Sequence, residues 1–514
     1  MRFIKLWLLA GVIGGCAQHP QQNSPVAPSV AESPLNITEQ QATDATPQQH
    51  NDVWDRILAS YRLNIDQDQK RITSQLNWYK SHQAYLDRVA DRSRRYLYFI
   101  AEQIEARNMP GELALLPIVE SAFDPFAYSH GRAAGVWQFI PSTGRDFDLH
   151  QDWWHDGRRD IRASTEAALS YLDALQRQFD GDWLLGLAAY NSGAGTVRKA
   201  IRKNRRLGKP TDFWSLQLPR ETRAYVPKLI ALARLLRDAE KYNIQFKPVA
   251  NQPYFAVVNT GGQIDLSQVA QLADTELEEI YKLNPVYNRW ATRPQGPHEI
   301  LVPYEKKDTF NKNLAQLPES ARLKWQRYVV RSGDSLISIA KRFHTTPDAL
   351  RQSNQLRGNM IRKGQALLIP SAMQAEGSYA YSAPQRLERL KQQRKPSNSN
   401  HSLRYRVQSG DSFWSIARAH DVSVRQLTRW NGLAPGDPLK PGQTLTIWTK
   451  KQTPAQREVI RTVHYKVRSG DSLARIASKF NVRLADVKRW NRQLASNKYL
   501  QPGQRLTLYV DVTR

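Results

Sequence analysis

The sequence predicts a multidomain protein in which an α-helical region is followed by small βααβ modules on linkers. Three observations lead to this prediction. The chain has 514 residues, which is too long for a single hydrophobic core. Residues 51–248 carry apolar side chains at helical spacing with almost no strand pattern. The second half of the chain repeats one short pattern three times, and repetition of this kind indicates separate copies of one folded unit.

The first sixteen residues, MRFIKLWLLAGVIGGC, have the pattern of an export signal peptide. A positively charged start precedes an apolar run that is much shorter than the roughly 20 residues needed to span a bilayer. The last four resemble a bacterial lipobox, which implies a lipid anchor on Cys16, the only cysteine of the chain. The resemblance also implies a location. In such lipoproteins an aspartate after the cysteine tends to retain the protein at the inner membrane, so Ala17 favours the periplasmic face of the outer membrane in a Gram-negative envelope. The alternative is an incidental cysteine in an ordinary signal peptide.

Residues 17–50 are rich in Gln, Pro, Ser and Ala and show no apolar period, so they are predicted to form a disordered tether. The net charge of the chain is +27, which suits either nucleic acid or an anionic cell-wall polymer as a partner. Because the basic residues are spread along the chain, no nucleic acid partner is expected.

The helical region should begin near residue 51, with its catalytic core at about 95–245. Apolar residues fall at i, i+3, i+4 and i+7 from Trp54 onward, and these aromatic side chains are expected in the core. Asp160 and Asp182 precede helical patterns and are predicted to be N-caps. The second of these helices should stop at the sequence Asn-Ser-Gly that ends at Gly193.

Within this region Glu120 is the one ionisable residue of an apolar stretch, Leu113 to Phe123, which Asp124-Pro125 should close. Removal from water favours the protonated form of a carboxylate. A carboxylic acid that stays protonated near neutral pH is what a general acid for glycoside cleavage requires. The alternative is that Glu120 is exposed at a frayed helix end.

The residues after Glu120 mix glycines, neutral polar groups and aromatic rings, which together suit an uncharged sugar. The glycines are expected to let the backbone approach a ligand, and the rings are expected to offer flat faces to it. The alternative is a glycine-rich turn over a core tryptophan. The glycines are Gly131, Gly135 and Gly144, the polar residues Ser129, Gln138, Ser142 and Thr143, and the aromatics Tyr128, Trp137 and Phe139.

Three ordered motifs resemble the signatures of the lysozyme-like lytic transglycosylases: ESAFDPFAYSHGRAAGVWQFIPST, AAYNSGAG and ETRAYVPKLIAL. The resemblance implies an α-helical lysozyme-like domain in which Glu120 is catalytic. By the same matching, five residues are expected to line the sugar cleft: Ser129, Gln138, Tyr190, Asn191 and Tyr225.

The resemblance also implies the reaction. Glu120 would act first as acid and then as base at the β-1,4 bond between N-acetylmuramic acid and N-acetylglucosamine, with a 1,6-anhydro product. The sequence offers no obvious second carboxylate, since Asp124 reads as a turn residue. No metal or cofactor is expected. A goose-type lysozyme, which would use Glu120 with water, and a non-catalytic wall-binding scaffold remain as alternatives.

The repeats resemble LysM modules, each a strand, two short helices and a strand, which implies peptidoglycan glycan strands as the partner. They are predicted at residues 327–371, 403–448 and 463–510, with 372–402 as a linker and a degenerate fourth module at 253–304. In the family, the loops that border the glycan groove correspond to Gly333, Asp334 and Ser335, to Gly410, Asp411 and Ser412, and to Gly470, Asp471 and Ser472. These aspartates also fit a structural role in the turn. The whole protein is expected to be a monomer.

Overall fold

The computed structural model describes residues 50–129, 131–393, 401–449, 460–480, 482–491 and 500–511. The predicted signal peptide, Cys16 and nearly all of the predicted tether lie outside these residues. The chain forms two compact units, one ending at Glu388 and the other beginning at Arg389. In the described ranges, no helix has both the length and the apolar character needed to cross a membrane.

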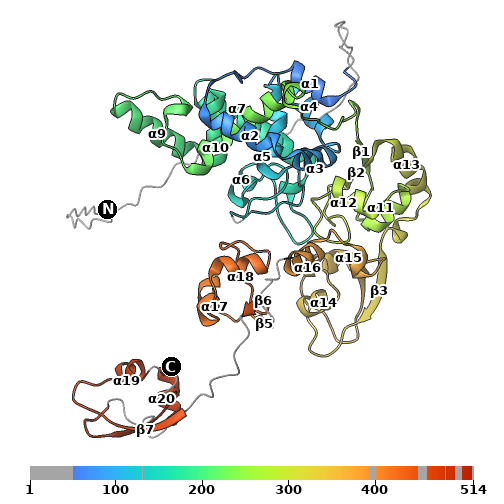
Figure 1. The fold of residues 1–514 in the computed structure, drawn as a ribbon. Helices are drawn as coiled ribbons and strands as arrows, with labels where there is room; N and C mark the ends of the chain where they lie inside the picture. Colours follow the sequence, from blue (N-terminus) through green and yellow to red (C-terminus); the bar gives the residue numbers. More distant parts are fainter. Residues whose placement is uncertain are drawn as a thin grey trace, which may run out of the picture. The chain divides into compact units, whose positions relative to one another are not determined.

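Ten helices build the first part of the N-terminal unit, which confirms the predicted helical region (Figure 1). They are α1 (Val53–Ala59), α2 (Lys70–Lys80), α3 (Gln83–Ser93), α4 (Leu97–Ala106), α5 (Leu116–Ser121), α6 (Pro141–Asp146), α7 (Ile161–Gln178), α8 (Trp183–Ser192), α9 (Ala194–Arg206) and α10 (Arg220–Arg237). The apolar side chains of all of them except α6 meet in one hydrophobic core, in which α10 packs against α2, α5 and α8. Trp54, Tyr79 and Tyr96 lie in this core, as their spacing predicted.

The capping residues mark the helix ends that the sequence predicted. The carboxylate of Asp160 accepts a hydrogen bond from the first turn of α7, and that of Asp182 accepts two from the first turn of α8. Helix α8 ends at Ser192 because Gly193 follows with a φ of +83°, a conformation that glycine adopts without steric cost.

Four modules follow, each with two short helices between the strands of a two-stranded antiparallel sheet. The first has β1 (Phe255–Asn259), α11 (Leu266–Leu272), α12 (Leu277–Leu283) and β2 (Glu299–Pro303), and α13 (Lys307–Gln316) comes after it. The next has β3 (Lys324–Val329), α14 (Leu336–Arg342), α15 (Pro347–Ser353) and β4 (Ala366–Ser371). The last two have β5 (His401–Arg406), α17 (Phe413–Ala419), α18 (Val424–Trp430) and β6 (Thr444–Thr449), then β7 (Ile460–Lys466), α19 (Leu473–Lys479), α20 (Leu484–Trp490) and β8 (Arg505–Asp511).

An asparagine after the second helix closes every module in the same way. In the second module, Asn354 Nδ2 donates to the Leu350 and Leu368 carbonyls at 2.9 and 2.7 Å, and Oδ1 accepts from the Leu368 amide at 2.7 Å. One side chain thereby satisfies both a helix end and a strand edge. The equivalent residues are Asn284, Asn431 and Asn491. Residues 253–304 therefore share the βααβ construction, although they lack the Ser-Gly-Asp turn.

The segment 372–402, expected to be a linker, is structured over most of its length. It contains α16 (Ala383–Gln393), and Tyr379 is buried against the first module. The Tyr379 hydroxyl donates to the carboxylate of Asp265 at 2.8 Å, and Asp265 also accepts from the Met373 amide. The polar composition of the segment predicts a linker, but its two tyrosines attach it to the folded unit: Tyr379 is buried and Tyr381 packs on Phe126.

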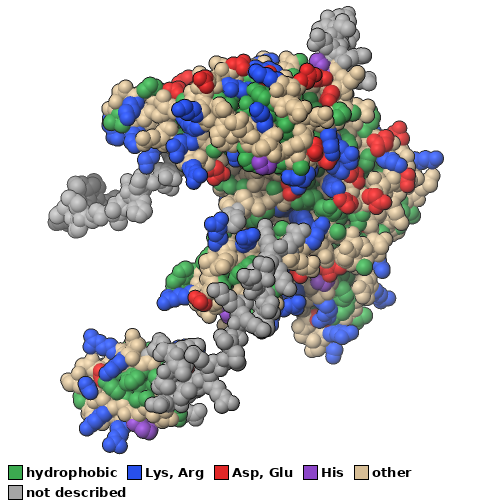
Figure 2. All heavy atoms as spheres, viewed as in Figure 1, with side chains coloured by type: hydrophobic (Ala, Val, Ile, Leu, Met, Phe, Trp, Pro, Cys, Tyr) green, Lys and Arg blue, Asp and Glu red, His purple; other side chains and the backbone are tan. Residues whose placement is uncertain are grey.

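The positive charge is distributed as the sequence suggested. Figure 2 shows Lys and Arg side chains scattered over the visible face, interspersed with acidic and neutral groups. Helix α9 is an exception, since its sequence AGTVRKAIRKNRR has six basic residues and no acidic one. Most of the basic surface therefore does not belong to a single recognition element.

Candidate active site

Glu120 lies near the end of α5, which a 3-10 turn over Gly111–Leu115 precedes. Pro117 stands in the first turn of α5, where its missing N–H removes no helical hydrogen bond. The apolar stretch is therefore a turn and a restarted helix rather than one continuous helix. The helix also ends earlier than expected, because Ala122 and Phe123 adopt left-handed φ values of +51° and +54°.

The environment of Glu120 shifts its ionisation. Burial raises the pKa of Glu120 to about 7, against the hydrogen bond that Tyr225 donates to Oε1, while the nearby charge of Glu221 adds to the rise. Tyr225 itself is buried on α10, with 4% of its surface exposed. Both protonation states of Glu120 are consequently populated near neutral pH.

The glycine-rich segment after α5 is held by side chains that donate to its successive carbonyls. The Gly135 carbonyl accepts a hydrogen bond from Gln138 Nε2 at 2.7 Å, and the Val136 carbonyl accepts one from Ser121 Oγ at 3.0 Å. The carbonyl of residue 137 accepts from the Tyr190 hydroxyl at 2.9 Å. Helices α5 and α8 thus fix this loop, and Gln138 has a left-handed φ of +52° there.

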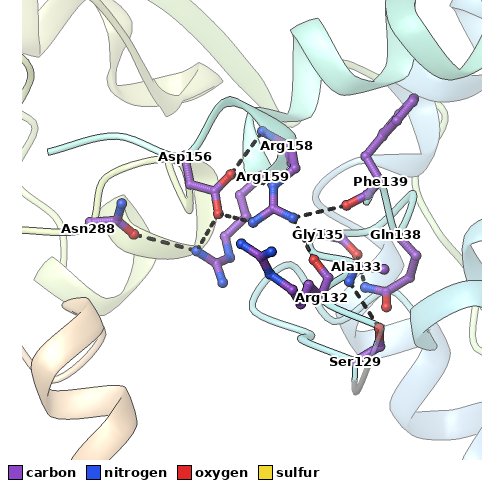
Figure 3. A network of polar contacts seen from close by, with 10 residues as sticks. All are labelled: Ser129, Arg132, Ala133, Gly135, Gln138, Phe139, Asp156, Arg158, Arg159 and Asn288. Atoms are coloured by element: carbon purple, nitrogen blue, oxygen red, sulfur yellow. Dashed lines mark hydrogen bonds and ion pairs between the residues drawn. The ribbon is translucent and has the colours of Figure 1, made fainter. Parts of the chain in front are cut away.

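A buried ion network supports the same loop from the other side (Figure 3). The guanidinium of Arg158 forms two hydrogen bonds with Asp156 and donates to the carbonyls of Arg132 and Phe139 at 2.6 and 3.2 Å. Burial alone would raise the pKa of Asp156, but the charges of Arg159 and Arg158 outweigh it and hold that pKa below its usual value. The carboxylate stays ionised and keeps the network intact.

The network extends into the first module. Arg159 donates to Asp156 at 3.1 Å and to Asn288 Oδ1 at 3.5 Å (Figure 3). The backbone N–H of Asn288 donates to the Trp154 carbonyl at 2.7 Å. The module that follows the helical region therefore contacts the segment that braces the glycine-rich loop.

Two expectations about the loop residues are corrected by this packing. Trp137 and Phe139 are 0% and 3% exposed, so they belong to the core and offer no face to a sugar. Two of the three glycines serve packing within the protein: a Cβ on Gly135 would lie 2.2 Å from the Arg158 carbonyl oxygen, and one on Gly144 would touch the Arg158 side chain. The alternative of a glycine-rich turn over a core tryptophan is the correct one for these residues.

The remaining predicted cleft residues have the following contacts. Ser129 Oγ accepts from the Ala133 amide at 3.0 Å and so closes the turn of the loop. Asn191 Oδ1, at the end of α8, accepts from Thr222 Oγ1 of α10 at 2.8 Å. The structure thus brings Tyr190 and Tyr225 to Glu120, while Ser129 and Gln138 shape the adjoining loop.

Sequence reasoning missed three contributors to this site. Ser121 follows Glu120 directly and ties α5 to the loop, a role that its polar side chain after an apolar run could have suggested. Glu221, in the first turn of α10, raises the pKa of Glu120 from a position 101 residues further along the chain. The Asp156–Arg158 pair also escaped notice, because only the fold shows that it is buried.

The aspartates of the LysM loops have the structural contacts that their turn motif suggested. Asp334 accepts from the Tyr328 hydroxyl at 2.6 Å and from the Arg331 amide at 2.8 Å. Asp411 and Asp471 accept the corresponding pair of bonds, and Ser335, Ser412 and Ser472 cap the helices that follow. Gly333, Gly410 and Gly470 have φ values of +83°, +87° and +85°, which the turn requires.

No group of three or more His, Cys, Asp or Glu side chains that could hold a metal ion occurs in the parts of the chain that the structure describes.

Comparison with known families agrees with this construction. Residues 97–213 match the Transglycosylase SLT domain, and residues 328–370, 405–448 and 465–508 match the LysM domain. Residues 254–319 match the family described as "Lytic transglycosylase MltD, LysM-like domain". The fold and these matches define the class of the protein, a lytic transglycosylase with LysM repeats.

The chain belongs to the family of the membrane-bound lytic murein transglycosylases D. It is 39% identical over 409 residues to membrane-bound lytic murein transglycosylase D of Escherichia coli K12, covering 78% of this chain and 86% of that protein. It is 34% identical to the cell wall-binding protein YocH of Bacillus subtilis over 85 residues, 16% of this chain and 27% of that one. The crystal structure of the 70 kDa soluble lytic transglycosylase of Escherichia coli matches with 24% identity and a TM-score of 0.22, over 29% of this chain and 24% of that chain.

Proposed function

We propose that the protein cleaves the β-1,4 bond between N-acetylmuramic acid and N-acetylglucosamine in peptidoglycan and leaves a 1,6-anhydro-N-acetylmuramic acid end. Glu120 carries the reaction. In its protonated form Glu120 donates its proton to the glycosidic oxygen, and the bond between that oxygen and C1 breaks. The 2-acetamido carbonyl helps to stabilise the cationic sugar that results. The ionised Glu120 then takes the proton of the muramoyl 6-hydroxyl, which attacks C1. No water is consumed, and the proton returns Glu120 to its starting state.

The observation that carries this proposal is the position of the Glu120 carboxylate at the end of α5, where the buried hydroxyl of Tyr225 donates a hydrogen bond to it and burial raises its pKa to about 7. A group that must give a proton and then take one works best when its pKa lies near the operating pH. The hydrogen bond from Tyr225 supports this balance, because it stabilises the ionised form that burial disfavours.

The carboxylates near Glu120 fit a mechanism with a single acid–base residue. Most glycosidases pair two carboxylates across the scissile bond. Asp124 is committed to a turn, since its Oδ1 accepts from the Phe126 amide at 2.9 Å. Glu221 is exposed at the start of α10 and acts on Glu120 through its charge. We assign Glu221 a tuning role, and to Ser129, Gln138, Tyr190 and Asn191 the positioning of the sugar and the loop beneath it.

The rest of the chain delivers the enzyme to its substrate. The three LysM repeats bind peptidoglycan glycan strands through the loops at Gly333–Ser335, Gly410–Ser412 and Gly470–Ser472. A lipid on Cys16 anchors the protein, as a monomer, to the periplasmic face of the outer membrane, and the segment 17–50 is its tether. The first module packs on the helical region through Asn288 and serves as a brace rather than a glycan binder.

Digestion of purified peptidoglycan tests the proposal through the masses of the released muropeptides. The wild-type protein should release products that end in an anhydro sugar and are one water lighter than hydrolysis products. Glu120→Gln should release almost none, while Asp124→Asn should retain cleavage. Products with a normal reducing end would favour the goose-type lysozyme. Unchanged products from Glu120→Gln would show that another residue is catalytic, and no products from the wild type would favour the scaffold.

A further inference from the structure

A cavity of about 460 Å³ lies in the N-terminal unit, apart from the residues around Glu120. Three parts of the chain line it: Trp153 after the glycine-rich loop, Arg289 and Trp290 of the first module, and residues 340–345 of the second module. Residues of the segment 371–384 complete the lining. Its volume is in the range of small-ligand sites. We call this cavity the tryptophan pocket.

The walls of the tryptophan pocket combine flat apolar faces with positive charge. Trp153 and Trp290 both contact Trp154: the centroid of the Trp154 ring lies 4.6 Å from that of Trp153 and 5.5 Å from that of Trp290. The guanidinium of Arg289 lies over the Trp153 ring at 4.1 Å, an arrangement in which cation and indole attract each other. Burial lowers the pKa of Arg289 only to about 10, so it stays charged at neutral pH. Lys341 is exposed at the rim.

Two buried donors of the pocket lack a partner. Thr345 is 6% exposed, and its hydroxyl has no hydrogen-bond partner among the described residues. The same holds for Nε of Arg289. Buried polar groups in folded proteins are nearly always satisfied, so these two donors are available to a ligand in the cavity that accepts hydrogen bonds.

The charges favour an anion. The lining contains Arg289, Lys341, Arg342 and His344 against one acid, Glu376. Of these, Arg342 is already paired with Asp334 at 3.2 Å. Lys341 has no ion-pair partner within the described ranges, so it and Arg289 are the cations available to a ligand.

We propose that the tryptophan pocket binds the acidic peptide that is attached to muramic acid in peptidoglycan. This inference rests on the proposed function, which brings the protein to a polymer whose muramic acids carry short peptides with free carboxylates. A peptide carboxylate pairs with Arg289 and Lys341 and accepts a hydrogen bond from Thr345, while apolar parts of the peptide rest on the two indoles. The protein therefore holds peptide-substituted strands more tightly than bare glycan.

The test uses the full chain with Glu120→Gln, so that ligands are not consumed, and titration calorimetry with three probes. These are an anhydro-disaccharide carrying its tetrapeptide, the same disaccharide without peptide, and inorganic phosphate. The proposal predicts tightest binding of the first probe. In the same background, Lys341→Gln should weaken that binding about tenfold and Thr345→Val about fivefold. Neither variant should alter binding of the peptide-free disaccharide.

The controls separate this inference from the enzymatic proposal. Lys312→Gln removes an exposed lysine of α13 that does not line the pocket and should leave every affinity unchanged. Thr345→Val should not lower thermal stability, since it replaces a buried hydroxyl without a partner by a methyl group. Equal affinity for the two disaccharides, tight binding of phosphate, or unchanged affinity in both pocket variants would overturn the inference. None of these results depends on whether the wild type forms anhydro ends.

Discussion

The hydrogen bond from Tyr225 to Glu120 gives the most informative prediction about the active site. Tyr225→Phe removes one hydroxyl and keeps the buried ring in place. The hydrogen bond stabilises the ionised carboxylate, so its loss should raise the pKa of Glu120 further. A hydrogen bond to a charged group contributes about 1.5–3 kcal/mol. Since 1.36 kcal/mol corresponds to one pKa unit, the rise should be about one to two units.

The pH dependence of kcat/KM on purified peptidoglycan measures this shift. The first step needs protonated Glu120, so activity should fall as the pH rises through its pKa. In the wild type this fall should lie near pH 7, and in Tyr225→Phe it should lie about one to two units higher.

Tyr190→Phe is the matched control for this experiment. The Tyr190 hydroxyl donates to the Trp137 carbonyl at 2.9 Å and not to Glu120, so its removal changes the loop without removing a bond from the carboxylate. Whatever the rate of this variant, the fall in its activity should stay near pH 7. A fall at unchanged or lower pH in Tyr225→Phe, or an equal shift in both variants, would refute the reasoning.

Three further predictions concern the same site. Glu221→Gln removes the like charge that raises the pKa of Glu120, so the fall in kcat/KM should move to lower pH while the products keep their anhydro ends. Burial raises the pKa of Glu120 from 4.5 to about 7, so the folded state holds this proton more tightly than the unfolded state does. The contribution of Glu120 to the free energy of unfolding is therefore complete below pH 4.5 and is lost as the pH rises through 7. Denaturant titrations should therefore show the wild type losing about 3 kcal/mol over this interval relative to Glu120→Gln, and parallel curves would contradict the assignment. Gly135→Ala places a Cβ within 2.2 Å of the Arg158 carbonyl oxygen at a φ of +81°, so it should lower the free energy of unfolding by at least about 2 kcal/mol. The control is Gly195→Ala on α9, where a Cβ would have nothing within 4 Å. In thermal melts this control should be neutral or slightly stabilising.

Features that depend on local sequence were predicted well. The N-caps Asp160 and Asp182 and the stop at Gly193 act within one helical turn of themselves, so the residue pattern contains all the information they need. The LysM modules were predicted because one pattern recurs, and each closing asparagine bonds to backbone groups of its own module.

Features that depend on burial were predicted less well. The order of residues in the loop could not show whether Trp137 faces the core or a ligand. Its indole N–H donates to Thr165 of α7, which lies 28 residues further along the chain. The segment around Tyr379 was expected to be a linker because its composition is polar. Its buried hydroxyl bonds to Asp265, a contact between residues 114 apart that composition does not reveal.

The position of Glu120 combines both kinds of information. The apolar stretch before it predicted that the carboxylate would be withdrawn from water. The size of the rise in the pKa of Glu120 also depends on Tyr225 and Glu221 of α10, which only the folded chain brings to α5. The resemblance to a family identified Tyr225, whereas nothing in the local pattern pointed to Glu221.

The central claim is that Glu120 alone acts as acid and then as base, so that the muramoyl 6-hydroxyl and not water attacks C1. Digestion of peptidoglycan in water enriched in oxygen-18, followed by mass spectrometry of the released muropeptides, tests this claim most directly. If the 6-hydroxyl attacks, the products should have anhydro ends without the heavy isotope. Incorporation of oxygen-18 at C1 of the product sugar would contradict it, because the attacking group would then be water.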